Sequence, residues 1–470
     1  MVYDSLFAIN DKFEVKPQMV GEHEVSKDGL TYTFTLRDGL KFHDGAPVRS
    51  ADCIASIERW ARRDALGQKL AEATESWKAV NDKTFTLKLK APFPLTLDAL
   101  AKPSSNVPFI MPERIAKTDA FTQINEYVGS GPMRFVRDEW VPGAKAVFAK
   151  FNDYVPRDEP SSWLAGGKRM MVDRVEWIVM PDPATASAAL QNGEVDWWEN
   201  PIPDLVPILR RNRNIAVDIA DPLGNIGAFR MNHLHPPFNN LKVRQAVMTA
   251  LNQEDYMRAL VGDDDNLWKK LGGFFTPGTP LYTEAGGEMM KAANMERGRQ
   301  MLRESGYNNE PVICVVAQDQ PITKAQGDVT ADLLKRLGMN VDFVATDWGT
   351  VGQRRAMKNP PNQGGWGMFH TWHAGADAIN PVIYNAVRAN GDGAWFGWPS
   401  VPAVEAEVPN WLAATNLEQE RAAIDRLNRA AVENVVYCPT GFFLGYQAWR
   451  RNVSGVVKGP IPFAWGVSKS

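Results

Sequence analysis

Two short segments near the start of the chain alternate strictly between polar and apolar residues. Residues 31–37 read Thr-Tyr-Thr-Phe-Thr-Leu-Arg, and residues 84–90 read Thr-Phe-Thr-Leu-Lys-Leu-Lys. This period of two predicts antiparallel strands that each bury one face. Between them, the segment 50–60 is predicted to be a helix, with Ser50 as a candidate N-cap. The pattern therefore predicts a small α/β unit near the N-terminus.

From about residue 130 onward, predicted strands alternate with predicted helices. The apolar segment 175–180 predicts a strand, Pro183 begins a helix that Gly193 ends, and residues 195–198 return to extended structure. This strand–helix–strand order is typical of a parallel sheet. A second block of the same kind begins near Lys242. Its predicted helices are 243–251, 294–305, 329–337 and 417–433, and its predicted strands are 312–317, 340–344 and 434–438.

One long segment, residues 359–400, follows neither period. It is rich in Gly, Pro, Asn and Trp, which predicts an irregular loop. A loop of this length is uncommon as a mere connector, and long loops often carry binding sites. The segment contains Trp366, Trp372, Trp395 and Trp398, and Trp348 lies shortly before it. We expect at least one of them to line a solute-binding surface, the alternative being a satellite core under the loop.

Length, composition and charge narrow the class of protein. A chain of 470 residues suits two or three domains, and 44% apolar with 23% charged residues is ordinary for a globular protein. A net charge of −3 gives no basic excess, so we expect no nucleic-acid partner. The apolar stretches are far shorter than the roughly 20 residues of a membrane-spanning helix. Tryptophan is abundant, with 16 residues, and histidine is scarce, with 6.

The three cysteines predict neither a metal site nor a disulfide framework. Cys53, Cys314 and Cys438 have no metal-like spacing, and each lies in an apolar context. We expect buried, inert thiols, with a single disulfide as the alternative.

No constellation of residues predicts catalysis. The chain has no Gly-x-Ser-x-Gly, P-loop or His-Glu-x-x-His motif. Ser130 lies in a glycine-rich turn, but no histidine is suggested as its base. The pairs His233/His235 and His370/His373 could each supply two metal ligands, yet neither has a clear third ligand. We therefore expect no enzyme, no cofactor and no metal site.

A specific motif follows the first predicted strand. Leu36-Arg37 is followed by Lys41-Phe42-His43-Asp44-Gly45-Ala46-Pro47-Val48, within the segment 29–48. This resembles the signature of the peptide/nickel family (family 5) of extracytoplasmic solute-binding proteins of ABC importers, which includes dipeptide- and oligopeptide-binding proteins. Further resemblances follow in family order, at residues 129–132, 193–196, 232–238 and 242–246. The resemblance spans residues from about 3 to 465.

The resemblance implies an α/β, two-lobed periplasmic-binding-protein-like fold, type II in its large three-domain variant, with a hinge between the lobes. Lobe one (domain I) would comprise 1–15, 130–228 and 441–470, the extra β-rich domain 16–129, and lobe two (domain III) 229–440. Two segments, near 225–232 and 438–444, would cross between the lobes. Bound solute would then shift the population toward a closed form.

The resemblance also implies the function and the partners. The protein would deliver a small solute, either a peptide or an aromatic or apolar small molecule, to the membrane permease subunits of an ABC importer. We expect a periplasmic or extracytoplasmic monomer, with a signal peptide and a first strand preceding Met1. The alternatives are a nickel or metal-chelate binding protein of the same family, a peptide-binding chaperone-like module, and an enzyme on the same scaffold.

The resemblance points to one segment for ligand recognition. In peptide-binding relatives, a Gly-Trp-x-x-Asp segment supplies an aspartate that pairs with the amino group of the peptide. Here Trp372 matches, Gly375 holds the strict aspartate position, and Asp377 fits only with a two-residue insertion. Peptide recognition through the amine therefore stays open. The residues that we expect to contact the ligand are Tyr3, Ser130, Asn225, Trp348, His370, Trp372, Asp377 and Trp395.

Overall fold

The computed structural model describes residues 1–104 and 106–470, and the contacts between residues divide this chain into two units. Unit 1 comprises Met1–Trp197, Asn214–Ala216 and Trp449–Ser470. Unit 2 comprises Trp198–Arg213 and Val217–Ala448. The chain therefore passes from one unit to the other after Trp197, Arg213, Ala216 and Ala448.

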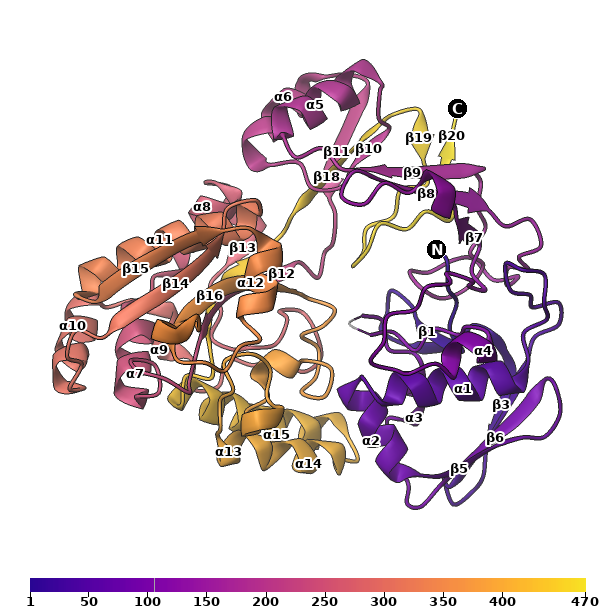
Figure 1. Ribbon diagram of the computed structural model, residues 1–470, viewed down its shortest axis with the longest axis horizontal. Coiled ribbons are helices and arrows are strands. Elements are labelled where there is room, and N and C mark those ends of the chain that lie inside the picture. Colours follow the sequence, from indigo (N-terminus) through magenta and orange to yellow (C-terminus); the bar gives the residue numbers. More distant parts are fainter. Residues whose placement is uncertain (105) are drawn as a thin grey trace. The chain divides into compact units, whose positions relative to one another are not determined.

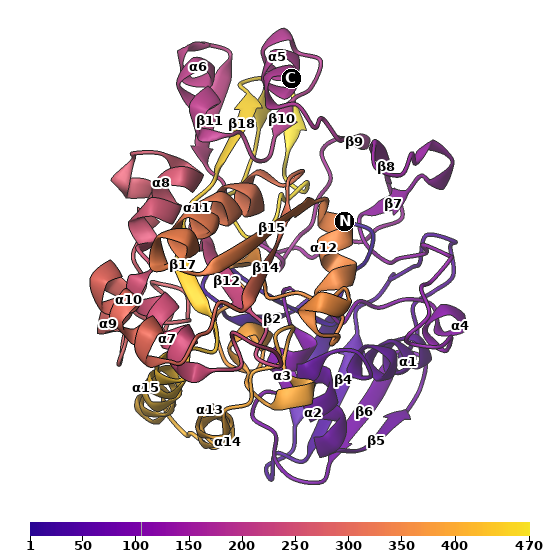
Figure 2. The same cartoon turned by 60° about the vertical axis from the view of Figure 1, so that its left-hand side comes forward.

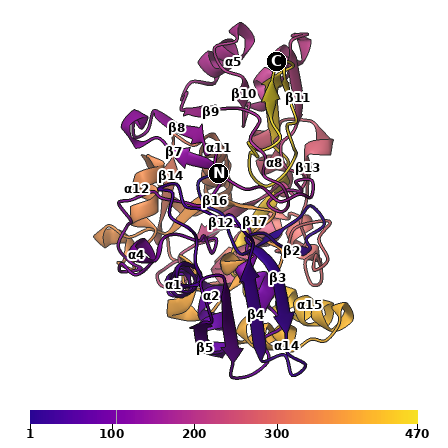
Figure 3. The same cartoon turned by 90° about the vertical axis from the view of Figure 1, so that its right-hand side faces the viewer.

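An antiparallel four-stranded sheet forms the largest sheet of unit 1 (Figure 3). Its order is β3 (Val20–Val25), β4 (Thr31–Leu36), β6 (Thr84–Leu89) and β5 (Thr74–Ala79). The alternating apolar residues of β4 and β6 are buried, which confirms both predicted strands. α1 (Ser50–Ala61) contacts β5 and confirms the predicted helix. Its N-cap is Arg49 rather than Ser50, because Asp52 accepts the Arg49 N–H at 2.8 Å.

The remaining elements of unit 1 are short. Its helices are α2 (Ala65–Ala73), α3 (Thr96–Leu100), α4 (Glu113–Ala116) and α5 (Pro183–Asn192). Its other strands are β1 (Phe7–Ile9), β2 (Val15–Pro17), β7 (Met133–Phe135), β8 (Lys145–Lys150), β9 (Arg174–Ile178), β19 (Val453–Ser454) and β20 (Ser468–Lys469). The predicted end of α5 is confirmed, since Gly193 takes a left-handed conformation with φ of 84°.

Three strands contain points at which the chain passes between the units. β18 (Tyr446–Arg450) lies between β10 (Trp197–Trp198) and β11 (Ile215–Ile219) (Figure 2). Sequence analysis instead expected crossings near 225–232 and 438–444. These segments form β12 (Asn225–Met231) and β17 (Cys438–Phe443), which pair antiparallel inside unit 2. The expected crossings were therefore wrong, whereas the three-domain division stays a prediction.

A mixed six-stranded sheet forms the centre of unit 2. Its order is β13 (Trp268–Lys269), β17, β12, β16 (Met368–Ala374), β14 (Pro311–Ala317) and β15 (Asn340–Thr346). β14 runs parallel to β15 and β16, which confirms the predicted strands 312–317 and 340–344. The predicted strand 434–438 was misplaced, because β17 begins at Cys438. β16 lies inside the segment predicted to be a loop.

Helices cover this sheet. α8 (Gln253–Val261) and α11 (Pro321–Leu337) contact each other, and α11 lies along β14 and β15 (Figure 1). α12 (Trp348–Arg354) contacts β14, and its Val351 packs with Ile313, Val315 and Phe369 in one apolar cluster. The other long helices are α7 (Leu241–Ala250), α10 (Met295–Glu304) and α15 (Leu417–Glu433).

Two further expectations concern the whole chain. Cys53, Cys314 and Cys438 are buried and unbridged, as expected of inert thiols. Across the described ranges, 1–104 and 106–470, no helix is both long enough and apolar enough to cross a membrane.

Candidate functional site

Aromatic rings gather over one part of the unit 2 sheet. The ring of Trp395 lies 5.2 Å from Phe396, 5.3 Å from His373 and 5.8 Å from Phe369, measured between ring centroids. Trp348 packs half-buried against the same apolar cluster. We call these five residues the Trp395 cluster. Two other tryptophans of the segment, Trp366 and Trp398, are 0% and 7% exposed and belong to the core beneath it.

The guanidinium of Arg355 lies among these rings. Its central carbon is 4.7 Å from the ring centroid of Phe396, 5.3 Å from Trp348, 5.5 Å from Trp395 and 5.8 Å from Phe369. Among the described residues, no carboxylate oxygen lies within 4.0 Å of it, and its buried Nε has no acceptor. Burial lowers the pKa of Arg355. A buried donor without an acceptor is costly, so an anionic group placed here would be stabilised.

Local structure fixes the position of this arginine. Asp347 caps α12 and accepts hydrogen bonds from the N–H and the hydroxyl of Thr350, at 2.9 and 2.6 Å. The N–H of Trp348 donates to Asp319 at 2.8 Å. Trp348 and Arg355 are seven residues apart, which is two helical turns and places both on one face. The helix therefore presents an indole and a guanidinium together.

His373 and two tyrosines extend the cluster. Its ring lies 5.1 Å from Tyr384 and 6.2 Å from Tyr437, and the two tyrosine hydroxyls are 2.5 Å apart. Burial, with the charges of Arg230 and Arg355, lowers the pKa of His373 to about 3, so its imidazole is neutral at pH 7. Its Nε2 is buried without a partner among the described residues.

His370 does not belong to this site, contrary to the expectation from the sequence. It is 1% exposed, and its Nε2 lies 2.7 Å from the Thr330 hydroxyl while its Nδ1 lies 3.2 Å from the Ala228 carbonyl. Residues three apart in a strand point to opposite faces, so His370 and His373 cannot share one metal ion. Within residues 1–104 and 106–470, no group of three His, Cys, Asp or Glu residues could hold a metal.

The other expected contacts of unit 2 lie near the cluster or in the same sheet. Trp372 is half-buried, with its ring 6.2 Å from that of Trp348. Asp377 follows β16 in a turn, where its N–H donates to Ala374 at 2.9 Å. Its charge contributes to raising the pKa of Tyr384, after the larger effects of burial and of Tyr437. Asn225 is half-buried at the first position of β12, opposite Ala374.

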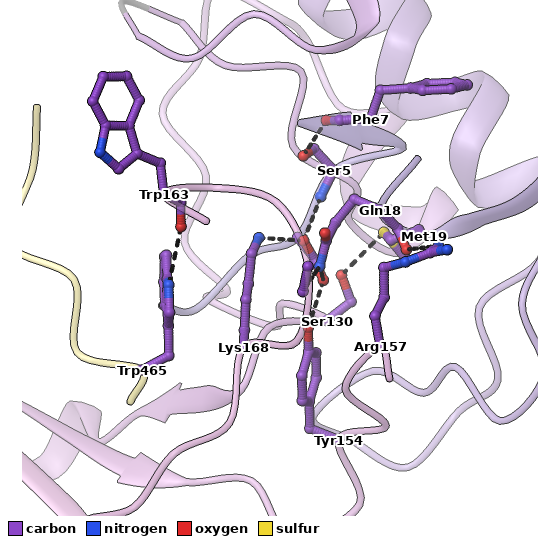
Figure 4. Close-up of polar contacts among 12 residues, drawn as sticks. Ser5, Phe7, Gln18, Met19, Ser130, Tyr154, Arg157, Trp163, Lys168 and Trp465 are labelled. Carbon is purple, nitrogen blue, oxygen red and sulfur yellow. Dashed lines mark hydrogen bonds and ion pairs between the residues drawn. The ribbon is translucent and has the colours of Figure 1, made fainter. Parts of the chain in front are cut away.

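Two expected contacts, Tyr3 and Ser130, belong to unit 1. Ser130 is 4% exposed, and its hydroxyl lies 3.9 Å from the sulfur of Met19, within a packed region (Figure 4). The ring of Tyr3 stacks on Phe109 at 5.6 Å, and its buried hydroxyl has no partner among the described residues. Burial, followed by Tyr127 and Glu126, raises the pKa of Tyr3 to about 12. Tyr3 is therefore a better candidate contact than Ser130.

The comparison with family models identifies the class of protein. Residues 14–394 match the model described as bacterial extracellular solute-binding proteins, family 5 middle. The chain belongs to this family. It is a solute-binding protein of an ABC importer, as predicted.

Related sequences and structures agree with this assignment. The solute-binding protein is 34% identical to a probable peptide ABC transporter periplasmic-binding protein of Sinorhizobium fredii, over 100% of this chain and 88% of the relative. It is 27% identical to a glutathione-binding protein of Pectobacterium atrosepticum, over 89% of this chain and 78% of the relative. The solved structure of the binding protein AgaA from A. tumefaciens with agropinic acid matches with a TM-score of 0.82 at 20% identity, over 100% of this chain and 93% of that chain. This likeness confirms the predicted fold class, the periplasmic-binding-protein-like fold.

Sequence analysis missed the most informative residue of the solute-binding protein, Arg355. A signal for it existed, because a cation two helical turns after Trp348 and just before the tryptophan-rich segment would share a surface with aromatic rings. Arg355 has no carboxylate partner among the described residues, and this could not be seen from the sequence. Arg230, whose guanidinium carbon lies 5.2 Å from the ring of Trp395, was missed for the same reason.

Proposed function

We propose that this solute-binding protein captures a small organic solute that carries a carboxylate beside an apolar or flat portion, and delivers it to the importer's permease subunits. One observation supports this solute class. The guanidinium of Arg355 is surrounded by four aromatic rings, and no carboxylate of the described residues pairs with it. The solute would supply the missing anion, and the rings would contact its apolar part.

The chemistry of arginine favours this solute. A guanidinium forms two parallel hydrogen bonds with a carboxylate, and such bonds strengthen when water is excluded. A hydrogen bond to a charged group contributes about 1.5–3 kcal/mol. Micromolar binding requires only about −8 kcal/mol in total, so this contact with two or three ring contacts would account for most of it.

Two classes of solute fit the proposal. A peptide would place its C-terminal or a side-chain carboxylate at Arg355, and an aromatic or apolar acid would do the same without an amine. Two relatives in sequence, which are named for a peptide and for glutathione, support the choice of a small organic solute. A metal chelate is not favoured, because His370 lies in the core.

The proposed ligand contacts of unit 2 are therefore Arg355, Trp348, Trp372 and Trp395, with Asn225 and Asp377 retained from the sequence. We further propose that the protein is a monomer outside the cytoplasm that binds its solute without chemical change, with closure of a hinge upon binding. The motifs of catalytic serine and metal enzymes are missing from the sequence, which supports binding alone.

The test compares acids with their amides. A thermal-shift screen of dipeptides, N-acetylated amino acids and aromatic acids would identify binders, and titration calorimetry would then compare each binder with its carboxamide. We expect the acid to bind at least about tenfold more tightly, and Arg355→Met to lose about 10- to 100-fold in affinity for the acid.

A matched control is Lys358→Met. Lys358 also lies over an indole, 5.3 Å from the ring of Trp398, but it is exposed and already pairs with Asp392 at 2.7 Å. Its replacement is expected to leave the affinity unchanged. Equal affinity of wild type and folded Arg355→Met for an acid would rule out the proposal.

A further inference from the structure

A second arginine, Arg230, lies in the core of unit 2 beneath the Trp395 cluster. It belongs to the central strand β12 and is 0% exposed. Its guanidinium carbon lies 5.2 Å from the ring of Trp395 and 5.7 Å from the ring of Tyr437. Among the described residues it forms no ion pair with a carboxylate within 4.0 Å. A buried charge without a counter-ion is expensive, so its presence in a sheet core calls for a specific role.

All three nitrogen atoms of this guanidinium donate to one irregular segment. The Nε donates to the carbonyl of Phe396 at 2.5 Å, the Nη1 to that of Ala386 at 2.7 Å, and the Nη2 to that of Trp395 at 3.2 Å. Buried carbonyls outside a sheet or helix need such donors, and only arginine offers several in a fixed planar arrangement. One strand residue therefore fixes both ends of the segment 386–396.

The same segment approaches the strand closely at its end. Gly397 has φ of 102°, and its carbonyl accepts the N–H of His233 at 2.9 Å. A Cβ atom at this glycine would lie 2.5 Å from the carbonyl oxygen of Met231, so only glycine fits. The chain just after the segment is thus also bonded to His233, two residues beyond the end of β12.

Two of the residues that Arg230 holds are among the four whose rings surround Arg355. Two of the three carbonyls belong to Trp395 and Phe396, and the rings of these residues lie 5.5 and 4.7 Å from the Arg355 guanidinium. We infer that Arg230 is a positioning residue of the solute site, which holds Trp395 and Phe396 in place against Arg355 without touching the solute. This inference rests on the proposed function, because the site it serves is the proposed one.

The alternative is that Arg230 only stabilises the fold, and Arg244 provides the matched control. Arg244 is also buried, at 6% exposure, and donates to the carbonyls of Phe238 at 2.8 Å and Asn434 at 3.0 Å. It belongs to α7 and bonds no residue of the segment 386–396. Arg230→Lys and Arg244→Lys would both weaken the core of unit 2, but only Arg230→Lys would loosen this segment.

The first readout needs no solute. Hydrogen exchange by mass spectrometry would follow the segment 386–397, and 5-fluorotryptophan labelling would report Trp395 by ¹⁹F NMR, assigned with Trp395→Phe. In Arg230→Lys we expect exchange in this segment to rise by about tenfold for each hydrogen bond lost, with a shifted or broadened Trp395 resonance. In Arg230→Ala, millimolar guanidinium is expected to restore part of the protection. Arg244→Lys is expected to change neither signal.

The second readout uses N-acetylphenylalanine and its amide as probes. If the segment loosens in Arg230→Lys and the affinity for N-acetylphenylalanine falls as well, the inference is supported. If exchange and the Trp395 resonance match those of Arg244→Lys, the inference is overturned. If the segment loosens but wild type prefers no acid of the screen over its amide, the proposed function fails while Arg230 is still shown to position the segment.

Discussion

Replacement of Asp4 by asparagine is expected to be strongly destabilising, although it changes few atoms. Asp4 is 1% exposed in unit 1. Its Oδ1 accepts hydrogen bonds from Lys168 at 2.8 Å and from the Ser5 N–H at 3.0 Å, and its Oδ2 accepts one from the Tyr154 hydroxyl at 2.9 Å. Figure 4 shows Lys168 and Tyr154 converging on this point. The substitution removes the only carboxylate that pairs with Lys168 in the described residues.

The magnitude follows from burial. The side chains of Lys168 and Asp4 are 6% and 1% exposed, and removal of one partner from such a pair costs about 3–5 kcal/mol. Lys168 would keep its position over the ring of Trp465, 5.3 Å away, and a cation–π contact is worth about 0.5–2 kcal/mol. We therefore expect a loss near the lower end, about 3 kcal/mol in the free energy of unfolding.

The assay is urea denaturation at pH 7, followed by far-UV circular dichroism. Asp153→Asn is the control, because Asp153 pairs with Lys41 on the surface, with side chains 54% and 45% exposed, and its loss should cost less than about 1 kcal/mol. Asp4→Asn combined with Lys168→Met should recover part of the loss, since no unpaired charge remains. A cost for Asp4→Asn no larger than that of Asp153→Asn would refute the reasoning.

The pH dependence of the same pair has a definite sign. Burial alone would raise the pKa of Asp4, but the charge and hydrogen bond of Lys168, with those of Tyr154 and Ser5, bring it below the ordinary value of 3.8. A carboxyl whose folded pKa is depressed contributes stability that is fully present above the unfolded pKa and is lost as the pH falls through the folded pKa. The stability that this ion pair contributes is therefore lost only at pH values below about 4.

Two further predictions concern unit 2. Burial lowers the pKa of His370 and of His373 to about 3, so below about pH 6.5 the unfolded chain binds more protons than the folded chain. The free energy of unfolding therefore decreases as the pH decreases, by up to ~1.4 kcal/mol per pH unit for each histidine. His370→Gln is expected to reduce this slope between about pH 4 and 6.5 in denaturant titrations, and an unchanged slope would contradict the assignment. Gly327→Ala should destabilise by ~1–3 kcal/mol despite the better helix propensity of alanine, because the added Cβ would lie 2.4 Å from a methyl group of Val316. Gly352→Ala in α12, where the Cβ would meet nothing within 4 Å, should be neutral or stabilising in thermal melts, and equal effects at the two sites would count against the packing argument.

The predictable parts of the fold are those whose pattern is local. β4 and β6 alternate between buried and half-exposed positions, and β14 is a continuous apolar run, so each could be recognised from its own residues. β16 could not, because it lies among Gly, Pro and Asn residues and is defined by its pairing with β12 and β14. Such long-range pairing leaves no periodic signal in a seven-residue segment.

The sequence singles out the tryptophan-rich segment but not the roles of its members. Only the structure separates the half-buried Trp395 from the core residues Trp366 and Trp398. His370 was misjudged because the sequence cannot show that Thr330 and Ala228 already bond both ring nitrogens. Arg355 was missed because the sequence cannot show that four aromatic rings surround its guanidinium and that no carboxylate of the described residues pairs with it.

Native mass spectrometry of the solute-binding protein, purified without refolding, tests the central claim most directly. Wild type and Arg355→Met would be compared, and any bound molecule would be released by denaturation and identified. We predict that wild type carries a small organic solute with a carboxylate, and that Arg355→Met, folded by circular dichroism, has lost it. A bound solute without an anionic group, or one that Arg355→Met retains at the same occupancy, would contradict the claim.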